Sequence, residues 1–331
     1  MTQYVLRRLL LLPFVLFSVS FIVFILIHAV PGDPVTNIVG EKATAEVRDK
    51  VRREHGFDKP VLVQYGIYLG RLVHGDLGRS YKRDEAVTTE IGRRLPSTIE
   101  LAFAAMAIAL VGGLALGVLS AVRKGGWIDT LSMTVALAGV SVPVFWLGLL
   151  LILSLGGIFG TGWEINPEYF PERITGFLLV DTLLKGEFRM FGDALRHLVL
   201  PAAALGSIPL AMTARITRAA MLEVLGSDYI RTARAKGLTP WRTVMRHAFR
   251  NAAIPIVTLV GLEFGYLLGG AVLTETVFSW PGMGTYILQS VGDREYNAIG
   301  GAVFVLSTVF VLANLAIDVL YAFIDPRVRY G

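Results

Sequence analysis

Long apolar segments recur along this chain, and they constrain its fold more than any other feature of the 331 residues. A helix needs about 20 apolar residues to cross the hydrocarbon core of a bilayer, where open strands cannot satisfy their backbone hydrogen bonds. Only 17% of the residues are charged, fewer than in an average soluble domain. The sequence therefore predicts an all-α polytopic membrane protein with six transmembrane helices, at about residues 9–30, 98–122, 128–158, 197–220, 252–274 and 299–324.

Basic residues at the ends of these segments indicate their orientation. The pair Arg7-Arg8 precedes the first apolar segment, and Arg123-Lys124 follows the second. Basic residues also fill the connection between the fourth and fifth segments, and with six spans all of them lie on one side. Because short loops rich in Lys and Arg stay in the cytoplasm, we expect both termini of this multi-pass membrane protein to be cytoplasmic.

The polar stretches between the apolar segments give the predicted domain organisation. Residues 1–30 form an N-terminal transmembrane helix, because the apolar run is too long for a signal peptide and has no small-residue cleavage site. Residues 31–97 form a periplasmic insertion. Residues 98–324 form the core transmembrane domain with a cytoplasmic loop at 221–251, and residues 325–331 form a cytoplasmic tail.

The connection between the fourth and fifth apolar segments combines a helix pattern with unbalanced positive charge. Gly237 is suited to end one short helix, and Thr239-Pro240 is suited to begin the next. On the second helix, a spacing of four residues places an apolar stripe beside a basic stripe. The apolar stripe is Trp241, Met245 and Phe249, and the basic stripe is Arg242, Arg246 and Arg250. This face favours contact with acidic groups of a partner protein or with lipid phosphates.

The residues needed for several kinds of chemistry are missing from the sequence. There is no cysteine, so disulfides and thiolate catalysis are excluded. The five histidines are scattered without the spacing of a metal site, and the dipeptide Gly-Lys of a phosphate-binding Walker loop does not occur. We therefore expect no enzyme activity, metal or cofactor in this chain. If ATP drives its action, ATP and Mg²⁺ must bind to another subunit.

Glu263 is a carboxylic acid near the middle of the fifth apolar segment. Ionisable side chains are costly at that depth and usually face a cavity or a partner. Two interpretations remain open. Glu263 is either a pore-facing acid that meets the amino group of a passing substrate, or a protonated or paired acid that holds two helices together.

Short sequence motifs are spread over almost the whole chain. They are PGDP at Pro31–Pro34, VQY and GDLG between Val63 and Gly78, RLPSTIELA ending at Ala102, RTARAKGL at Arg231–Leu238, HAFRNAAIP at His247–Pro255 and TETVFSWPGMG at Thr274–Gly284. With these motifs the chain resembles the permease subunits of bacterial ABC importers of the dipeptide, oligopeptide and nickel class.

The resemblance implies the type I ABC importer permease fold and the import of di- or oligopeptides. The implied partners are a second homologous permease, two cytoplasmic ATPase subunits that bind ATP and Mg²⁺, an extracytoplasmic substrate-binding protein and membrane lipid, but no nucleic acid. We expect the binding protein near Tyr65–Tyr81 and Phe278–Met283. The alternatives are a permease for nickel or another small solute, and an autonomous secondary transporter, for which Glu263 is the one candidate ion-coupling residue.

The resemblance also implies a role for the basic connection. In such permeases this cytoplasmic loop carries a Glu-Ala-Ala (EAA) motif, with Gly four positions later, and docks on the ATPase. Ala233 and Gly237 keep this pattern, while Arg231 and Thr232 replace the acid and the first Ala. The residues assigned to ATPase coupling are Arg231, Thr232, Ala233, Arg234, Gly237, Thr239, Trp241, Arg242 and Arg246. The alternative is a basic loop that lies on lipid headgroups.

Overall fold

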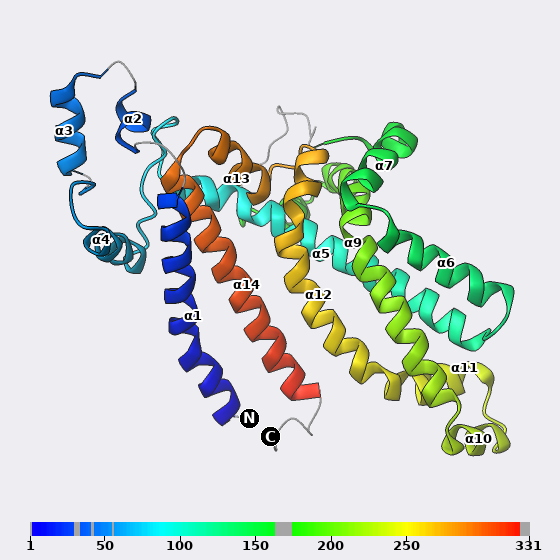
Figure 1. The fold of residues 1–331 in the computed structure, drawn as a ribbon. Helices are drawn as coiled ribbons and strands as arrows, with labels where there is room; N and C mark the ends of the chain where they lie inside the picture. Colours follow the sequence, from blue (N-terminus) through cyan, green and yellow to red (C-terminus); the bar gives the residue numbers. More distant parts are fainter. Residues whose placement is uncertain (1, 30–33, 41–42, 55, 163–173, 325–331) are drawn as a thin grey trace. The chain divides into compact units, whose positions relative to one another are not determined.

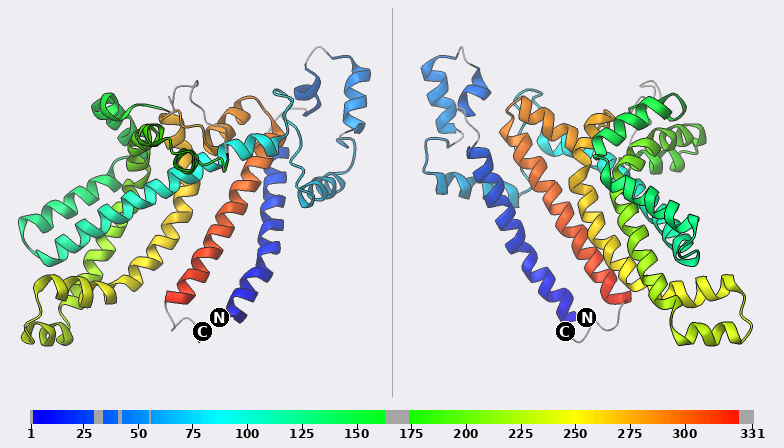
Figure 2. Two further views of the ribbon diagram at one scale, coloured as in Figure 1. Left: turned by 180° about the vertical axis from the view of Figure 1, so that it is seen from behind. Right: turned by 45° about the vertical axis from the view of Figure 1, so that its right-hand side comes forward.

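The computed structural model describes residues 2–29, 34–40, 43–54, 56–162 and 174–324, so the predicted tail at 325–331 lies outside the described residues. In this part of the chain the regular structure is helical, apart from one isolated bridge between Arg79 and Ala86. The predicted all-α class is therefore confirmed (Figures 1 and 2). The helices are α1 (Thr2–Ala29), α2 (Pro34–Val39), α3 (Ala45–Glu54), α4 (Val61–Val73), α5 (Val87–Val122), α6 (Trp127–Ser141), α7 (Val144–Phe159), α8 (Leu178–Leu184), α9 (Phe188–Leu225), α10 (Asp228–Ala235), α11 (Pro240–Arg242), η2 (Thr243–Ala248), α12 (Phe249–Val277), α13 (Met283–Gly292) and α14 (Tyr296–Ile324).

Among the described residues, five helical segments are long and apolar enough to cross a membrane. They are α1, α5, α9, the run from α11 through α12, and α14. The remaining predicted span, at 128–158, is instead the pair α6 and α7, bent by 110° at a short break. Val142 and Pro143 both leave the helical conformation, so the chain breaks at the proline of this segment. The count of six holds only if this bent pair forms one span.

Other helix boundaries also differ from the sequence-based expectation. The second long helix begins at Val87 and not near residue 98, and Pro96 lies inside it. Pro201 and Pro209 lie inside the unbroken helix α9, because neighbouring helices in a membrane protein can satisfy the backbone groups that proline frees. The connection before the last predicted span contains helix α13.

One compact unit comprises residues 98–280 and 312–324 of the described chain. Helix α9 is its central element, and it packs against α12, α6, α7 and α8. Figure 1 shows α9 between α6 and α12. Gly113 and Gly117 of α5 lie so close to α9 that an added Cβ would come within 2.8 Å and 2.6 Å of the backbone oxygens of Leu210 and Ala214. These two glycines therefore set the close approach of α5 and α9.

A second compact unit comprises residues 2–97 and 281–311 of the described chain. Its apolar core joins the start of α5, helix α13 and the start of α14. Gly78, with a φ of +83°, lies against α14, where an added Cβ would be 2.8 Å from the side-chain nitrogen of Asn297. Only glycine fits both this conformation and this contact. The core residues are Val87, Ile91, Met283, Tyr286, Ala298 and Ala302.

Candidate functional site

The basic connection after α9 folds as two short helical arms, α10 and α11–η2, that meet at Gly237. Gly237 has a φ of +78°, and apart from its chain neighbours no described residue has an atom within 4 Å of the position that a Cβ would occupy. The backbone conformation, and not a lack of space, therefore requires glycine at this turn. The predicted pair of short helices with a glycine between them is confirmed.

Helix α10 has a buried inner face and an exposed outer face. Ile230 and Ala233 are both buried, and Ile230 packs with residues near the ends of α5, α9 and α12. The phenolic oxygen of Tyr229 accepts a hydrogen bond from the side-chain nitrogen of Asn251 at 2.7 Å, which ties α10 to the start of α12. The remaining predicted coupling residues of this arm are exposed: Arg231, Thr232 and Arg234.

The second arm begins at Pro240, as predicted, but the Thr239 side chain makes no capping hydrogen bond. Instead, the backbone oxygen of Thr239 accepts hydrogen bonds from the amide and the hydroxyl of Thr243, at 3.0 and 3.1 Å. Thr243 is buried, and Trp241 is 72% exposed.

The predicted apolar stripe on this arm is wrong in part, because residues Thr243–Ala248 form a π-helix. A π-helix has an i→i+5 repeat, so it brings Thr243 and Ala248 to the same buried face. Met245 and Phe249 are half-buried and Trp241 is exposed, so these three side chains do not form one uniform face. The predicted basic stripe is exposed at all three of its positions, Arg242, Arg246 and Arg250.

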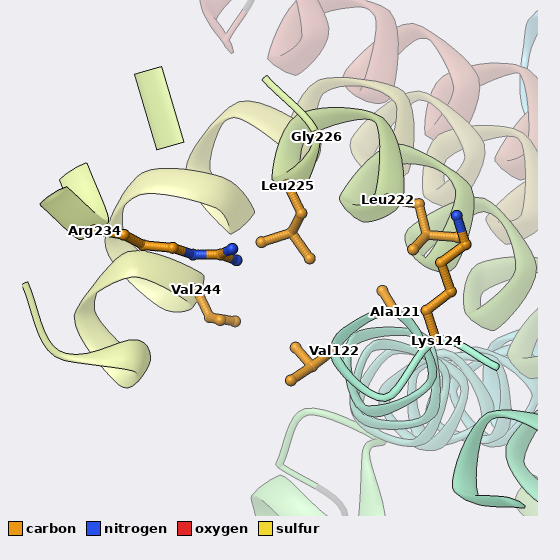
Figure 3. Close-up of a pocket in the computed structure, with 8 residues that line it drawn as sticks. All are labelled: Ala121, Val122, Lys124, Leu222, Leu225, Gly226, Arg234 and Val244. Carbon is orange, nitrogen blue, oxygen red and sulfur yellow. The ribbon is translucent and has the colours of Figure 1, made fainter. Parts of the chain in front are cut away.

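A hollow of about 270 Å³ lies between α10, η2 and the ends of α5 and α9 (Figure 3). Arg234 extends into it from α10, and Lys124 borders it from the other side. The rest of the lining is mainly aliphatic: Ala121, Val122, Leu222, Leu225, Gly226 and Val244. Arg234 thus has a different environment from the outward-facing arginines of this loop.

A carboxylate that the sequence did not single out joins three helices beside this hollow. Asp129 of α6 accepts hydrogen bonds from Nε and Nη2 of Arg218 of α9, at 2.8 and 2.9 Å. It also accepts hydrogen bonds from the hydroxyl of Ser120 of α5 and, at 2.9 Å, from the amide of Gly125. Because a two-point arginine–carboxylate pair is geometrically specific, this clamp fixes the end of α9 to the α5–α6 turn.

The two residues of the clamp, though not their pairing, could have been identified in the sequence from their charges. Asp129 and Arg218 are ionised residues within or at the edge of apolar segments, and such residues usually have a partner. The sequence does not reveal that they partner each other, since 89 positions separate them. Their pairing depends on the packing of α6 against α9.

Glu263 lies on α12 and is half-buried. Within the described residues it makes no hydrogen bond or ion pair. The nearby Gly261 packs closely on α14, where an added Cβ would be 2.2 Å from a methyl carbon of Ile317. The structure therefore brings Glu263 together with none of the coupling residues.

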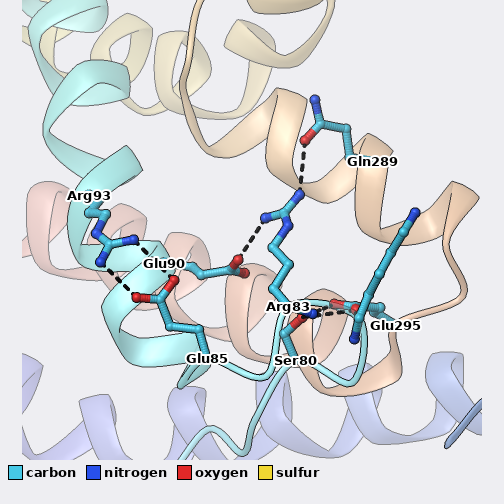
Figure 4. A network of polar contacts seen from close by, with 8 residues as sticks. Ser80, Arg83, Glu85, Glu90, Arg93, Gln289 and Glu295 are labelled. Atoms are coloured by element: carbon cyan, nitrogen blue, oxygen red, sulfur yellow. Dashed lines mark hydrogen bonds and ion pairs between the residues drawn. The ribbon is translucent and has the colours of Figure 1, made fainter.

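A network of polar contacts holds the loop before α5 against α13 in the second unit (Figure 4). Glu295 accepts hydrogen bonds from the Ser80 hydroxyl at 2.8 and 2.9 Å. Arg83 donates to Glu90 at 2.7 Å and to Gln289 at 3.4 Å. The hydrogen bond to Glu90 raises the pKa of Arg83, so its guanidinium group stays charged. The network makes this loop a fixed part of the second unit.

Several large side chains are buried in the two segments that were predicted to lie near a binding protein. Tyr65 is buried against α1, while Phe278, Trp280 and Met283 are almost completely buried. Phe278 is enclosed because it packs with Leu200 and residues of α7. These buried side chains do not themselves form an exposed contact surface, and the expectation that a binding protein lies near the two segments stays a prediction. Within the described residues, no group of three or more His, Asp or Glu side chains is placed to hold a metal ion.

Comparisons with known proteins cover the whole chain. Residues 113–330 match the family model "Binding-protein-dependent transport system inner membrane component", and residues 1–102 match "Binding-prot-dependent transport system membrane comp, N-term". The dipeptide transport system permease protein DppB of Alkalihalophilus pseudofirmus is 44% identical over 334 residues, covering 100% of both chains. The di/tripeptide transport system permease protein DppB of Pseudomonas aeruginosa is 46% identical over 335 residues, covering 100% of this chain and 99% of that protein.

A third relative and one solved structure extend the comparison. The glutathione transport system permease protein GsiC of Escherichia coli is 40% identical over 330 residues, covering 100% of both chains. A structure of the MetNI methionine ABC transporter in inward-facing conformations aligns with a TM-score of 0.54 at 18% identity, covering 72% of this chain and 97% of that one. From these matches, the chain belongs to the family of binding-protein-dependent transport system inner membrane components and has the type I ABC importer permease fold.

Proposed function

We propose that this chain is one permease subunit of an ABC importer that carries dipeptides across the bacterial inner membrane, with both termini in the cytoplasm. Two full-length relatives, at 44% and 46% identity, are named for dipeptide or di/tripeptide transport. A second homologous permease completes the pore in this proposal. Two cytoplasmic ATPase subunits bind ATP and Mg²⁺, and an extracytoplasmic protein delivers the substrate.

The two-armed loop at 228–248 is the ATPase-coupling element in this proposal. The observation that carries it is the anchoring of α10, whose inner residues Ile230 and Ala233 are buried in the permease. An arm held this way moves together with the helices beneath it. The exposed Arg231, Arg242 and Arg246 are free of burial costs and are suited to acidic groups on an ATPase surface.

The clamp at Asp129 couples movement of the loop to movement of the membrane helices. Helix α10 follows α9 after only two residues, and Arg218 near the end of α9 is bound to Asp129 of α6. When the ATPase subunits close, the loop is displaced and α9 and α6 move with it. Helices α6 and α7 meet at a sharp bend, which offers a place where such a displacement changes the shape of the pore.

Charge reversal tests docking on an ATPase against contact with lipid headgroups. The double variant Arg242→Glu/Arg246→Glu is compared with Arg189→Glu, an exposed arginine near the opposite end of α9. We expect the double variant to lose ATPase co-purification and ATP-driven uptake while it still inserts into the membrane, and the control to keep both. Normal uptake and co-purification by the double variant would indicate that the loop contacts lipid headgroups and does not dock on an ATPase.

For Glu263 we propose a position on the pore wall, where its carboxylate meets the amino end of the peptide. This proposal is supported by the half-buried carboxyl group, which has no partner within the described residues. Glu263→Gln should slow the uptake of dipeptides with a free amino terminus more than that of N-acetylated dipeptides. Equal uptake of both substrates by this variant and the parent protein would favour a structural acid.

Glutathione is the second candidate substrate, because one relative that matches the full chain at 40% identity is a glutathione permease. Competition distinguishes the two candidates. An excess of unlabelled dipeptide should abolish uptake of a labelled dipeptide by the assembled transporter, and an equal excess of glutathione should not. The reverse result would assign the transporter to glutathione.

A further inference from the structure

We propose that helix α4 lies in the membrane, with one apolar edge buried in the acyl chains of the lipid leaflet beside the C-terminal end of α1. This inference concerns the insertion after the first transmembrane helix and goes beyond the proposed transport function. It rests on the depth in the bilayer at which α4 contacts α1, on the rotation of α4 about its own axis, and on the residues along its two edges.

The depth of the contact is given by Tyr65, which is buried where α4 packs on α1. Its ring centroid lies 5.2 Å from those of Phe21 and Phe24, and its hydroxyl lies 2.9 Å from the hydroxyl of Ser20. All three α1 residues belong to the most apolar window of that helix, Leu9–Leu26. Ser20 is six positions before the end of the window, about 9 Å along the helix at 1.5 Å per residue. The contact therefore lies beside hydrocarbon and not in the water above it.

The rotation of α4 is given by its polar residues. In Figures 1 and 2, α4 crosses α1 and does not run along it. The Gln64 side-chain oxygen lies 3.2 Å from Nε2 of His28, which is two positions beyond the apolar window. Arg71 follows Gln64 by seven positions, about two helical turns, so it shares the same edge. This polar edge faces the C-terminal end of α1 and hence the membrane surface.

The opposite edge of α4 is apolar and exposed. Leu62 and Val73 are each 78% exposed, more than the other exposed hydrophobic side chains of this helix, Val61 and Val63. Each is two positions from a residue of the polar edge, Gln64 or Arg71, which is about 200° around a helix of 3.6 residues per turn. The edge of Leu62 and Val73 therefore points toward the middle of the bilayer.

In this proposal, lipid hydrocarbon covers the exposed apolar edge of α4. A single exposed Leu or Val needs no explanation in a soluble protein. Here, however, the exposed apolar edge lies opposite a polar edge. The polar edge faces the end of α1, at the membrane surface, and the apolar edge faces the middle of the bilayer. A helix of this kind lies in the membrane interface with its apolar edge in the acyl chains. The sequence separates α4 from α1 by a polar stretch, so only the packing of Tyr65 reveals this depth.

Spin labelling tests the proposal without removal of native thiols from this chain, which contains no cysteine, and the partner subunits are used in cysteine-free form. Leu62→Cys, Val73→Cys and the control Arg71→Cys are labelled one at a time in the assembled transporter, reconstituted in vesicles of phosphatidylethanolamine and phosphatidylglycerol. Collision with oxygen, which concentrates in lipid, is compared with collision with a water-soluble nickel chelate. We expect labels at positions 62 and 73 to favour oxygen and the label at position 71 to favour nickel.

Two results would overturn the proposal. Equal access of nickel at positions 62, 71 and 73 would place the apolar edge in water. Low collision rates with both reagents at positions 62 and 73, together with an immobilised label, would show that a protein surface covers the edge instead. Dipeptide uptake by each labelled transporter confirms that the cysteine substitutions leave the assembly intact.

Discussion

The turn at Gly237 offers a quantitative test of the coupling loop. Its φ of +78° lies in the left-handed region, where a residue with a Cβ costs about 1–2 kcal/mol. Because no described residue beyond its chain neighbours comes within 4 Å of the Cβ position, Gly237→Ala adds this conformational cost without a collision. A change of about 1–2 kcal/mol corresponds to about a 5- to 30-fold change in an equilibrium constant. If the ATPase binds the loop only in its observed conformation, Gly237→Ala should weaken ATPase binding by up to this factor.

The assay is a titration of the purified ATPase subunits onto the permease pair in lipid nanodiscs. Gly237→Asn should lose less affinity than Gly237→Ala, because asparagine tolerates the left-handed conformation, and Gly237→Val should lose more. Gly192→Ala is the matched control, since Gly192 lies in α9 and has equally open space around it. The reasoning fails if the Gly237→Ala and Gly192→Ala permeases bind the ATPase equally well, or if the Asn and Val variants cannot be told apart.

Three further predictions concern the scaffold around the site. Arg218→Met should lower the thermal midpoint of the solubilised transporter, and the double variant Asp129→Asn/Arg218→Met should lose less than the sum of the single variants, because the two residues act through one contact. Gly117→Ala should destabilise the α5–α9 contact by about 1–3 kcal/mol, because the added Cβ meets a backbone oxygen; a thermal midpoint equal to that of Gly192→Ala would contradict this. Burial alone would raise the pKa of Asp181, but hydrogen bonds from Thr175, Gly176 and Ile174 outweigh it and lower the pKa. Its contacts therefore stabilise the start of α8 above the usual carboxyl pKa of about 3.9 and are lost as the pH falls from that value through the lower pKa of the folded protein. The hydrogen-exchange protection factor of the Gly176 amide should fall over this range in the parent protein and show no such step in Asp181→Asn.

The sequence predicted best what depends on local pattern. The apolar lengths of the spans, the glycine turn at Gly237 and the helix start at Pro240 all follow from properties of single residues or short windows. The family motifs identified the fold, because they recur at several separated places in the chain.

What could not be predicted depends on tertiary packing or on small changes in helix geometry. The π-helix at Thr243–Ala248 alters which residues face inward, and no residue type marks it in the sequence. The bend between α6 and α7 follows from two consecutive non-helical residues, of which only Pro143 is visible as a breaker. The pairing of Asp129 with Arg218 joins helices far apart in the chain.

The central claim is that this chain is a permease whose cytoplasmic loop receives force from ATPase subunits. The most direct measurement is uptake of labelled dipeptide by proteoliposomes that contain this chain, its partner permease and the ATPases, with the binding protein outside and ATP inside. We predict uptake that requires both ATP and the binding protein and that is lost in Arg242→Glu/Arg246→Glu. Uptake by this chain alone, driven by an ion gradient without the ATPases, would contradict the claim.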